Sequence, residues 1–249
     1  HVIPTDTISI SIDKDAVLRS GIMLPDSIRH LKGEDLKNAI PDKIYISLKD
    51  MRILTKVDML MLEMLANCNW ERPLYMAISV GEVSKLKFDH YFVQEGLAFR
   101  FTPFDYKKWG NVKGDNNYAI DVERLYENVM NRYKYGGLDT PGLYLDETTL
   151  RTCYYHRRLF AQLAKELIRQ GDNTRARKVL AYAEQAVPAY NVPEIYESGS
   201  FDIAKACPRR KDESNASVKE PDSRIGRLHQ LGILIRRQQD QYGSERLPV

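Results

Sequence analysis

The sequence predicts an α+β fold, with an N-terminal mixed sheet-and-helix domain followed by an all-α region of helical hairpins. Segments with strand-like alternation are concentrated before residue 118, and helical periodicity dominates from residue 121 to residue 206. The 249 residues, 43% of them hydrophobic, suffice for one large domain or two of ordinary size. We therefore expect an α+β domain over residues 1–117, a helical domain over 118–206 and a divergent or partly disordered tail over 207–249.

The first elements alternate between strands and short helices. Apolar and polar residues take turns in the two strand segments, as in a half-exposed sheet. Asp13 precedes a short helix that Gly21 closes. The sequence thus predicts strands at 8–12 and 43–48, and helices at 14–19 and near 27–31.

The most apolar run of the chain is Thr55–Val80. Thr55 and Asp58 form a capping pair at the start of a helix. Its apolar residues are Val57, Met59, Leu60, Met61, Leu62, Met64 and Leu65, which cover it nearly all round. Such a helix is expected to lie in a core. Beyond Asn69, the segment Pro73–Val80 is rich in strand formers and predicts a central strand, and Gly96–Thr102 predicts another.

From Asp121 onward the pattern is helical. Asp121 precedes an apolar stripe that ends at Gly136-Gly137, and Asp146 precedes a longer helix that reaches Ile168.

A pattern of large and small residues then fits a tetratricopeptide-like helical hairpin: Leu163, Ala164, Leu167, Gly171, Ala176, Ala183 and Pro188. Small alanines let two antiparallel helices approach closely, Gly171 makes the turn, and Pro188 ends the second helix. One such unit cannot stand alone, so it is expected to pack on further helices. A second repeat begins at residues 194–206, but residues 208–221 are almost wholly polar. The tail is interpreted as a divergent repeat, with a frame change in the coding sequence as the alternative.

Composition excludes several classes of function. Nine basic and six acidic residues lie in 208–249, which leaves 28 of each sign elsewhere, so a nucleic-acid partner is not expected. Three separated cysteines without a CxxC pair, and five histidines without ligand spacing, predict no disulfide framework, metal site or cofactor. No run of 18 apolar residues occurs, so the fragment is expected to be soluble and not to insert in a membrane. It starts without an initiator Met, which we interpret as a piece of a longer protein.

No motif for catalysis is present, and two clusters remain as candidate binding sites. In the first, a charged pair beside an aromatic residue could face a cleft where the helix meets the strand. In the second, a polar and aromatic loop suits contact with sugar or peptide. For both, a structural role is favoured: an ion pair beside a core-filling tryptophan in the first, and packing in the second. The candidate binding residues are Trp70, Glu71, Arg72, Asp89, His90, Tyr91 and Glu95.

A series of short strings also resembles a known family. In order, they are Ile3-Pro-Thr-Asp6, Leu54-Thr-Lys56, Asn69-Trp-Glu-Arg-Pro73, Glu95-Gly-Leu97, Gly136-Gly137 and Tyr144-Leu-Asp-Glu147 with Arg151. They resemble the C-terminal region of large multi-pass membrane proteins abundant in Bacteroidota. These were long catalogued as a domain of unknown function and are related to protein O-mannosyltransferases of the glycosyltransferase-C type. The likeness covers residues 1–205, and the string at 69–73 is its most specific part.

The resemblance implies a soluble, periplasmic or extracytoplasmic module whose parent carries the transferase centre among its membrane helices. No catalytic residue is therefore carried onto this chain. The leading hypothesis is a non-catalytic module that binds an acceptor protein or another partner, or contacts the parent membrane domain. A tetratricopeptide-type scaffold for protein partners is the first rival. A small hydrolase or transferase with a cleft around Glu71, Arg72, Asp89 and His90 is the second.

Overall fold

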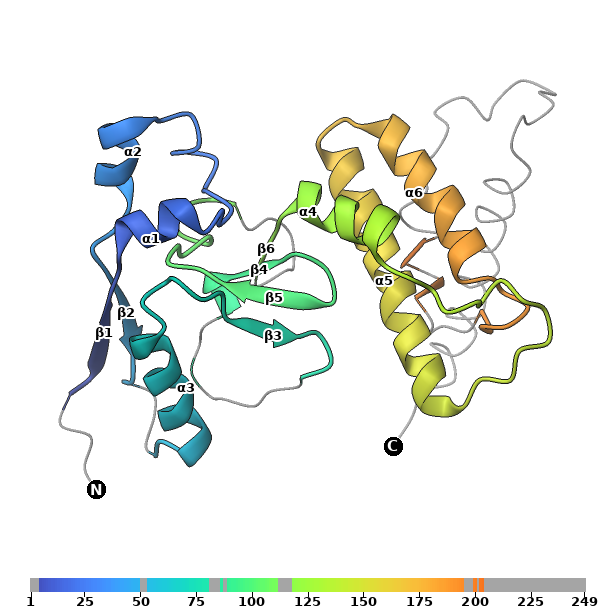
Figure 1. The fold of residues 1–249 in the computed structure, drawn as a ribbon, viewed down its shortest axis with the longest axis horizontal. Helices are drawn as coiled ribbons and strands as arrows, with labels where there is room; N and C mark the ends of the chain where they lie inside the picture. Colours follow the sequence, from blue (N-terminus) through green and yellow to red (C-terminus); the bar gives the residue numbers. More distant parts are fainter. Residues whose placement is uncertain are drawn as a thin grey trace, which may run out of the picture. The chain divides into compact units, whose positions relative to one another are not determined.

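The computed structural model describes residues 5–49, 53–80, 86, 89–111, 118–194, 199–200 and 202–203. The chain divides into two compact units, residues 1–121 and 122–249, and Figure 1 shows the elements of each. The predicted α+β content is confirmed: the described residues form two sheets and six α-helices, with the two longest helices in the second unit. The predictions for residues 207–249 fall outside the described residues.

A two-stranded antiparallel sheet opens the first unit. β1 (Thr7–Ser11) pairs with β2 (Lys43–Ser47), so that Ile10 faces Ile44. The predicted alternation is seen, since the isoleucines of β2 are buried between exposed residues. α1 (Lys14–Arg19) begins at Asp13, whose side chain accepts a hydrogen bond from the Ala16 amide.

The helix expected near residues 27–31 is not formed. The amides of Ile28 and Arg29 both donate to the Pro25 carbonyl, so the segment is a turn rather than a helix. The helix of this region is α2 (Gly33–Ala39), which begins two residues after the predicted segment ends.

The second sheet has four strands in the order β3-β5-β4-β6. They are β3 (Tyr75–Ala77), β4 (Phe92–Gln94), β5 (Ala98–Phe101) and β6 (Ala119–Ile120). The strand predicted at Gly96–Thr102 is confirmed as β5. The prediction that Pro73–Val80 forms a central strand is wrong, because β3 is a three-residue edge strand with exposed Tyr75 and Ala77.

The long helix of the first unit is α3 (Lys56–Asn67), which contacts β1 (Figure 1). The predicted capping pair is confirmed: the Thr55 amide donates to Asp58 Oδ2 at 2.8 Å, and the Asp58 amide donates to Thr55 Oγ1 at 3.2 Å. The prediction that this helix is buried all round is wrong, since only Asp58, Leu62 and Leu65 are buried.

Three helical elements and a π-helical turn make up the described part of the second unit. α4 (Val122–Glu127) continues into the π-helical turn Asn128–Arg132, which takes up the end of the predicted apolar stripe. α5 (Glu147–Arg169) and α6 (Asn173–Ala186) pack against each other as a helical hairpin (Figure 1). Gly171 makes the turn with a φ of 86°, where a side chain would strain the backbone.

The caps and close contacts of the hairpin follow the sequence. Asp146 accepts hydrogen bonds from two amides of the first turn of α5, and Asp172 accepts one from the Arg175 amide. Ala164, Ala176 and Ala183 are buried, as the predicted close approach requires.

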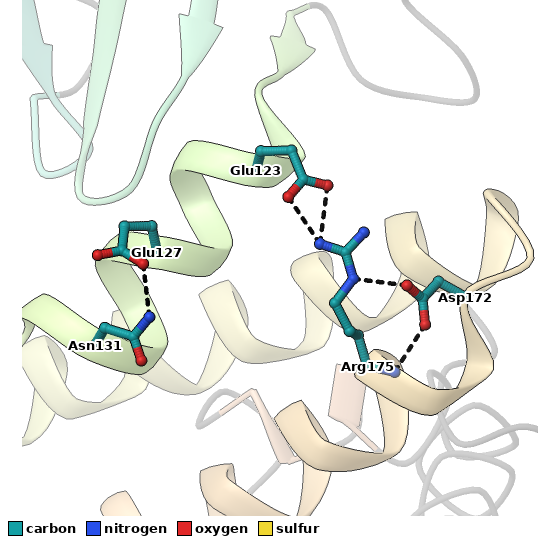
Figure 2. Close-up of polar contacts among 5 residues, drawn as sticks. All are labelled: Glu123, Glu127, Asn131, Asp172 and Arg175. Carbon is teal, nitrogen blue, oxygen red and sulfur yellow. Dashed lines mark hydrogen bonds and ion pairs between the residues drawn. The ribbon is translucent and has the colours of Figure 1, made fainter.

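Polar contacts on the surface join α4 to α6. Figure 2 shows Arg175 between the carboxylates of Glu123, at 2.8 Å, and Asp172, at 2.6 Å. The hydrogen bonds to Asp172 and then to Glu123 raise the pKa of the Arg175 guanidinium. On α4 and the π-helical turn, Asn131 Nδ2 donates to Glu127 Oε2 at 2.6 Å.

Candidate functional site

The apolar surface of α3 is wider than the area that the described residues of the first unit cover. On a helix that turns about 100° per residue, Asp58, Leu62 and Leu65 share one face and point into the protein. Met61 and Leu54 border this face and pack against the core. The remaining apolar side chains continue around the helix into solvent. Roughly half of the apolar arc of α3 is therefore uncovered in the described structure.

The uncovered side chains are large, and Val57, Leu60 and Met64 are neighbours on one side of α3. The uncovered set comprises Ile53, Val57, Met59, Leu60 and Met64, with exposed fractions of 74%, 41%, 61%, 62% and 51%. Single exposed apolar residues are ordinary, but three large ones at neighbouring positions of one helix favour a contact surface. We name residues 57, 60 and 64 the α3 face; Met59 lies about 100° farther round the helix from Leu60, and Ile53 precedes the helix.

The corner that follows α3 holds the first predicted binding cluster. Asn69 and Trp70 both have positive φ angles, 47° and 61°, which is uncommon for residues other than glycine. The turn drives the Trp70 ring into the core, where it stacks on Phe101 with 5.7 Å between ring centroids. Its Nε1 donates to the Ser11 carbonyl at 3.0 Å. Trp70 therefore fills the core, the role that the structural interpretation gave it.

The ion pair expected between Glu71 and Arg72 is not formed. Glu71 and Arg72 are both exposed, and no ion pair joins them in the described structure. Arg72 instead borders a small, partly open hollow with room for about one water molecule. The hollow is lined by Ile22, Cys68, Trp70, Arg72, Pro73, Leu74, Arg100 and Phe101.

Next to the hollow lies a cluster of buried polar residues, only one of which, Glu95, was predicted from the sequence. Glu95, one of the predicted residues, is 6% exposed and lies 3.6 Å from Arg100 Nη1. The Tyr75 hydroxyl donates to the other Glu95 oxygen at 2.9 Å, and Arg100 Nη2 donates to the Ser20 carbonyl at 2.8 Å. Arg100 and Tyr75 were missed. The available signal was the string Phe99-Arg100-Phe101, in which a charged residue stands between two large apolar residues of a predicted strand.

The second predicted cluster is divided between surface and core. Asp89 is exposed at the start of a 3₁₀ turn (Asp89–Tyr91), whereas Tyr91 is buried. His90 Nε2 lies 3.6 Å from Asp105 Oδ2, and Lys108 Nζ lies 3.2 Å from the same oxygen. Burial, with the negative charge of Asp105, raises the pKa of the Tyr91 phenol to about 12. The phenol therefore stays protonated at neutral pH.

The side chains that the enzyme hypothesis requires are not joined in the described structure. No hydrogen bond or ion pair connects any two of Glu71, Arg72, Asp89 and His90 there. Nor do the described residues contain a group of three or more histidine, cysteine, aspartate or glutamate side chains that could hold a metal ion. The geometry is that of a folded core with a small cationic hollow and an apolar helix face.

A comparison with protein families finds a match to the first part of the chain. Residues 1–123 match the family model described as TMEM260-associated domain 2. The match covers the sheets, α3 and the corner at 68–74, and is consistent with a domain associated with TMEM260-like O-mannosyltransferases. Comparisons with curated proteins and with solved structures returned no match. Among the described residues, no helix has the length and apolarity needed to cross a bilayer.

Proposed function

We propose that this chain is a non-catalytic accessory module of a membrane glycosyltransferase-like protein, and that its α3 face docks a helix of an acceptor or partner protein. The observation that carries the proposal is the uncovered apolar arc of α3, which lies within the segment matched by TMEM260-associated domain 2. The ordered strings of the sequence support a place on the extracytoplasmic side of the parent.

A helical partner is favoured by the spacing on α3. Val57, Leu60 and Met64 follow one another at intervals of three and four residues, which is the spacing of a helix–helix seam. An amphipathic helix laid along such a stripe would present its own residues at the same spacing. The unbranched methionine side chains adapt to partners of different shape. Burying Leu60 fully would contribute about 1.5–3 kcal/mol.

The helical unit supports a second candidate function, a tetratricopeptide-like scaffold for protein partners. Its support is the α5–α6 hairpin, with buried alanines at the helix contact and Gly171 in the turn. The backbone at Gly199 also lies close to α5, because a Cβ on Gly199 would lie 3.0 Å from Arg158 Cγ. Stacking of successive helices, as in the α5–α6 hairpin, is the basis of repeat scaffolds.

Site-specific photo-cross-linking in the full-length protein tests the first proposal. A photoreactive residue replaces Leu60 in one variant and Asn38, an exposed residue of α2, in the control. We expect one discrete cross-linked product from position 60, with an acceptor or a defined segment of another protein, and none from position 38. If position 60 gave no product, or the same diffuse products as position 38, docking through α3 would be wrong.

A further inference from the structure

We propose that the outer edge of β2 pairs with the β2 edge of a second copy of this chain, in an antiparallel arrangement that places the two Tyr45 residues opposite each other. The two-stranded sheets of the two copies then join as one four-stranded sheet in the order β1-β2-β2-β1. The surface is independent of the α3 face. The proposal rests on the free backbone groups of β2, the covered edge of β1 and the spacing of the β2 side chains.

The backbone of β2 points outward at every second residue. The Ile12 amide donates to the Asp42 carbonyl at 2.9 Å, and the Leu48 amide donates to the Asp6 carbonyl at 2.8 Å. In the observed register, the hydrogen-bonded pairs between β1 and β2 therefore lie at even-numbered positions. The residues between them turn their N–H and C=O groups away from β1; they are Lys43, Tyr45 and Ser47. In the described structure, the backbone groups of these three residues make no hydrogen bond.

The opposite edge of this sheet, along β1, is partly covered. Trp70 Nε1 donates to the Ser11 carbonyl at 3.0 Å, and α3 contacts β1. The edge of β2 is thus the more accessible of the two. A two-stranded sheet is marginally stable by itself, and a free strand edge is a template for a further strand. From Lys43 to Ser47, β2 has a regular register and no proline that would block such pairing.

The spacing of the outward-facing residues favours a second copy as the partner. Lys43 and Ser47 each lie two residues from Tyr45. A two-fold axis at Tyr45 therefore places Lys43 of each copy opposite Ser47 of the other, so that the lysines do not face each other. Each of these pairs is of the hydrogen-bonded type, in which the two residues exchange both of their N–H···O=C bonds. The edge is self-complementary in charge and in hydrogen bonding.

Side chains on both faces of the sheet support the same register. Tyr45 is 64% exposed on the solvent face, and the axis brings the two Tyr45 side chains together as a cross-strand aromatic pair. On the core face, Ile44 and Ile46 are buried in each copy. The register places Ile44 opposite Ile46 of the other copy in the closely spaced type of pair, so the apolar face continues across the junction.

Sedimentation velocity of the 249-residue chain, over a range of concentrations, tests the proposal. We expect a reversible dimer. Tyr45→Glu and Tyr45→Lys each place like charges opposite each other and should weaken self-association about tenfold. An equal mixture of the two variants should restore it, because opposite charges then meet at the axis. Ser9→Glu is the matched control: Ser9 is the partner of Tyr45 on β1 and is also exposed, so this change should leave the dimer intact.

Amide hydrogen exchange measures the pairing without a substitution. Exchange of the Tyr45 amide should slow as the protein concentration rises, whereas exchange of the Ser9 amide should not change. The proposal is overturned if the chain stays monomeric, if the dimer survives both Tyr45 variants, or if mixing them restores nothing. Protection of the Tyr45 amide that required another protein would likewise give the edge a different partner and refute self-pairing. None of these outcomes bears on docking through α3, so the two proposals fail separately.

Discussion

Removal of the Arg157 guanidinium should strongly destabilise the helical unit. Arg157 is 3% exposed and projects from α5 into the segment that follows α6. Its Nη1 donates to the Pro193 carbonyl at 2.9 Å and to Ser200 Oγ at 3.1 Å, and its Nη2 donates to the carbonyls of Val187, at 3.2 Å, and Val192. In Arg157→Met the aliphatic volume is largely kept, but these acceptors lose their charged donor.

The cost follows from the number of buried acceptors. The contacts with Ser200, Val187 and Val192 are buried, and an unsatisfied buried group costs about 1–3 kcal/mol. Part of this loss is offset, because the variant no longer buries a charged guanidinium. We therefore expect a net loss of about 3 kcal/mol in the free energy of unfolding.

Urea denaturation followed by circular dichroism measures the loss, with Arg169→Met as the matched control. Arg169 is also on α5, but its side chain is 41% exposed and pairs with Glu166 on the surface, so its removal should cost less than about 0.5 kcal/mol. If Arg157→Met were destabilised by less than about 1 kcal/mol, the interpretation of Arg157 as the clamp on this segment would be refuted.

Three further predictions concern the two units. Leu65→Ala should lose about 2–4 kcal/mol in urea denaturation and Leu60→Ala less than about 0.5, because the first side chain is 6% exposed and the second 62%; equal losses would contradict the orientation of α3. Gly171→Ala should lower the free energy of unfolding by about 1–2 kcal/mol, from the positive φ alone. Gly199→Ala should lower it measurably more, because a Cβ at 199 would also meet packed atoms of α5; the reverse order in denaturation would refute the packing at 199. Burial lowers the pKa of His156 from 6.5, so His156 is protonated at a higher pH in the unfolded chain than in the folded one, and stability should fall as pH falls below about 6.5. Thermal unfolding of His156→Phe should lack this part of the pH dependence. If the pH dependence persisted in the variant, it would belong to another group.

Local signals predicted the helix caps and the hairpin turn well. The Thr55–Asp58 capping box and the Asp146 cap depend on residues within three positions of each other, so the sequence contains all that they need. Gly171 was predicted as a turn for the same reason, since a positive φ is a local requirement.

Burial was predicted less well, because it depends on which surfaces are available. α3 has apolar side chains on two faces, and the sequence does not say that the described structure covers only the face of Leu62 and Leu65. For β3, the apolar composition of 73–80 suggested a central strand, but only residues 75–77 pair, with β5. An apolar segment thus predicts that its side chains are buried, but it does not predict which part of the protein or which partner buries them.

The candidate site was recovered in the same uneven way. Trp70 and Arg72 line the hollow as neighbours in sequence, so a local string could identify them. Arg100 joins them from β5, and Ser20 and Tyr75 hold the buried guanidinium and its carboxylate from two further segments. Contacts between such distant positions are set by the tertiary fold, which the sequence pattern alone did not specify.

The affinity of the α3 face for its partner tests the central claim most directly. The partner segment identified by cross-linking from position 60 is titrated with the 249-residue chain and with Leu60→Glu. We predict that Leu60→Glu keeps its melting temperature but binds at least tenfold more weakly, since about 1.5–3 kcal/mol of apolar burial is replaced by a buried charge. Unchanged affinity of Leu60→Glu would contradict the account.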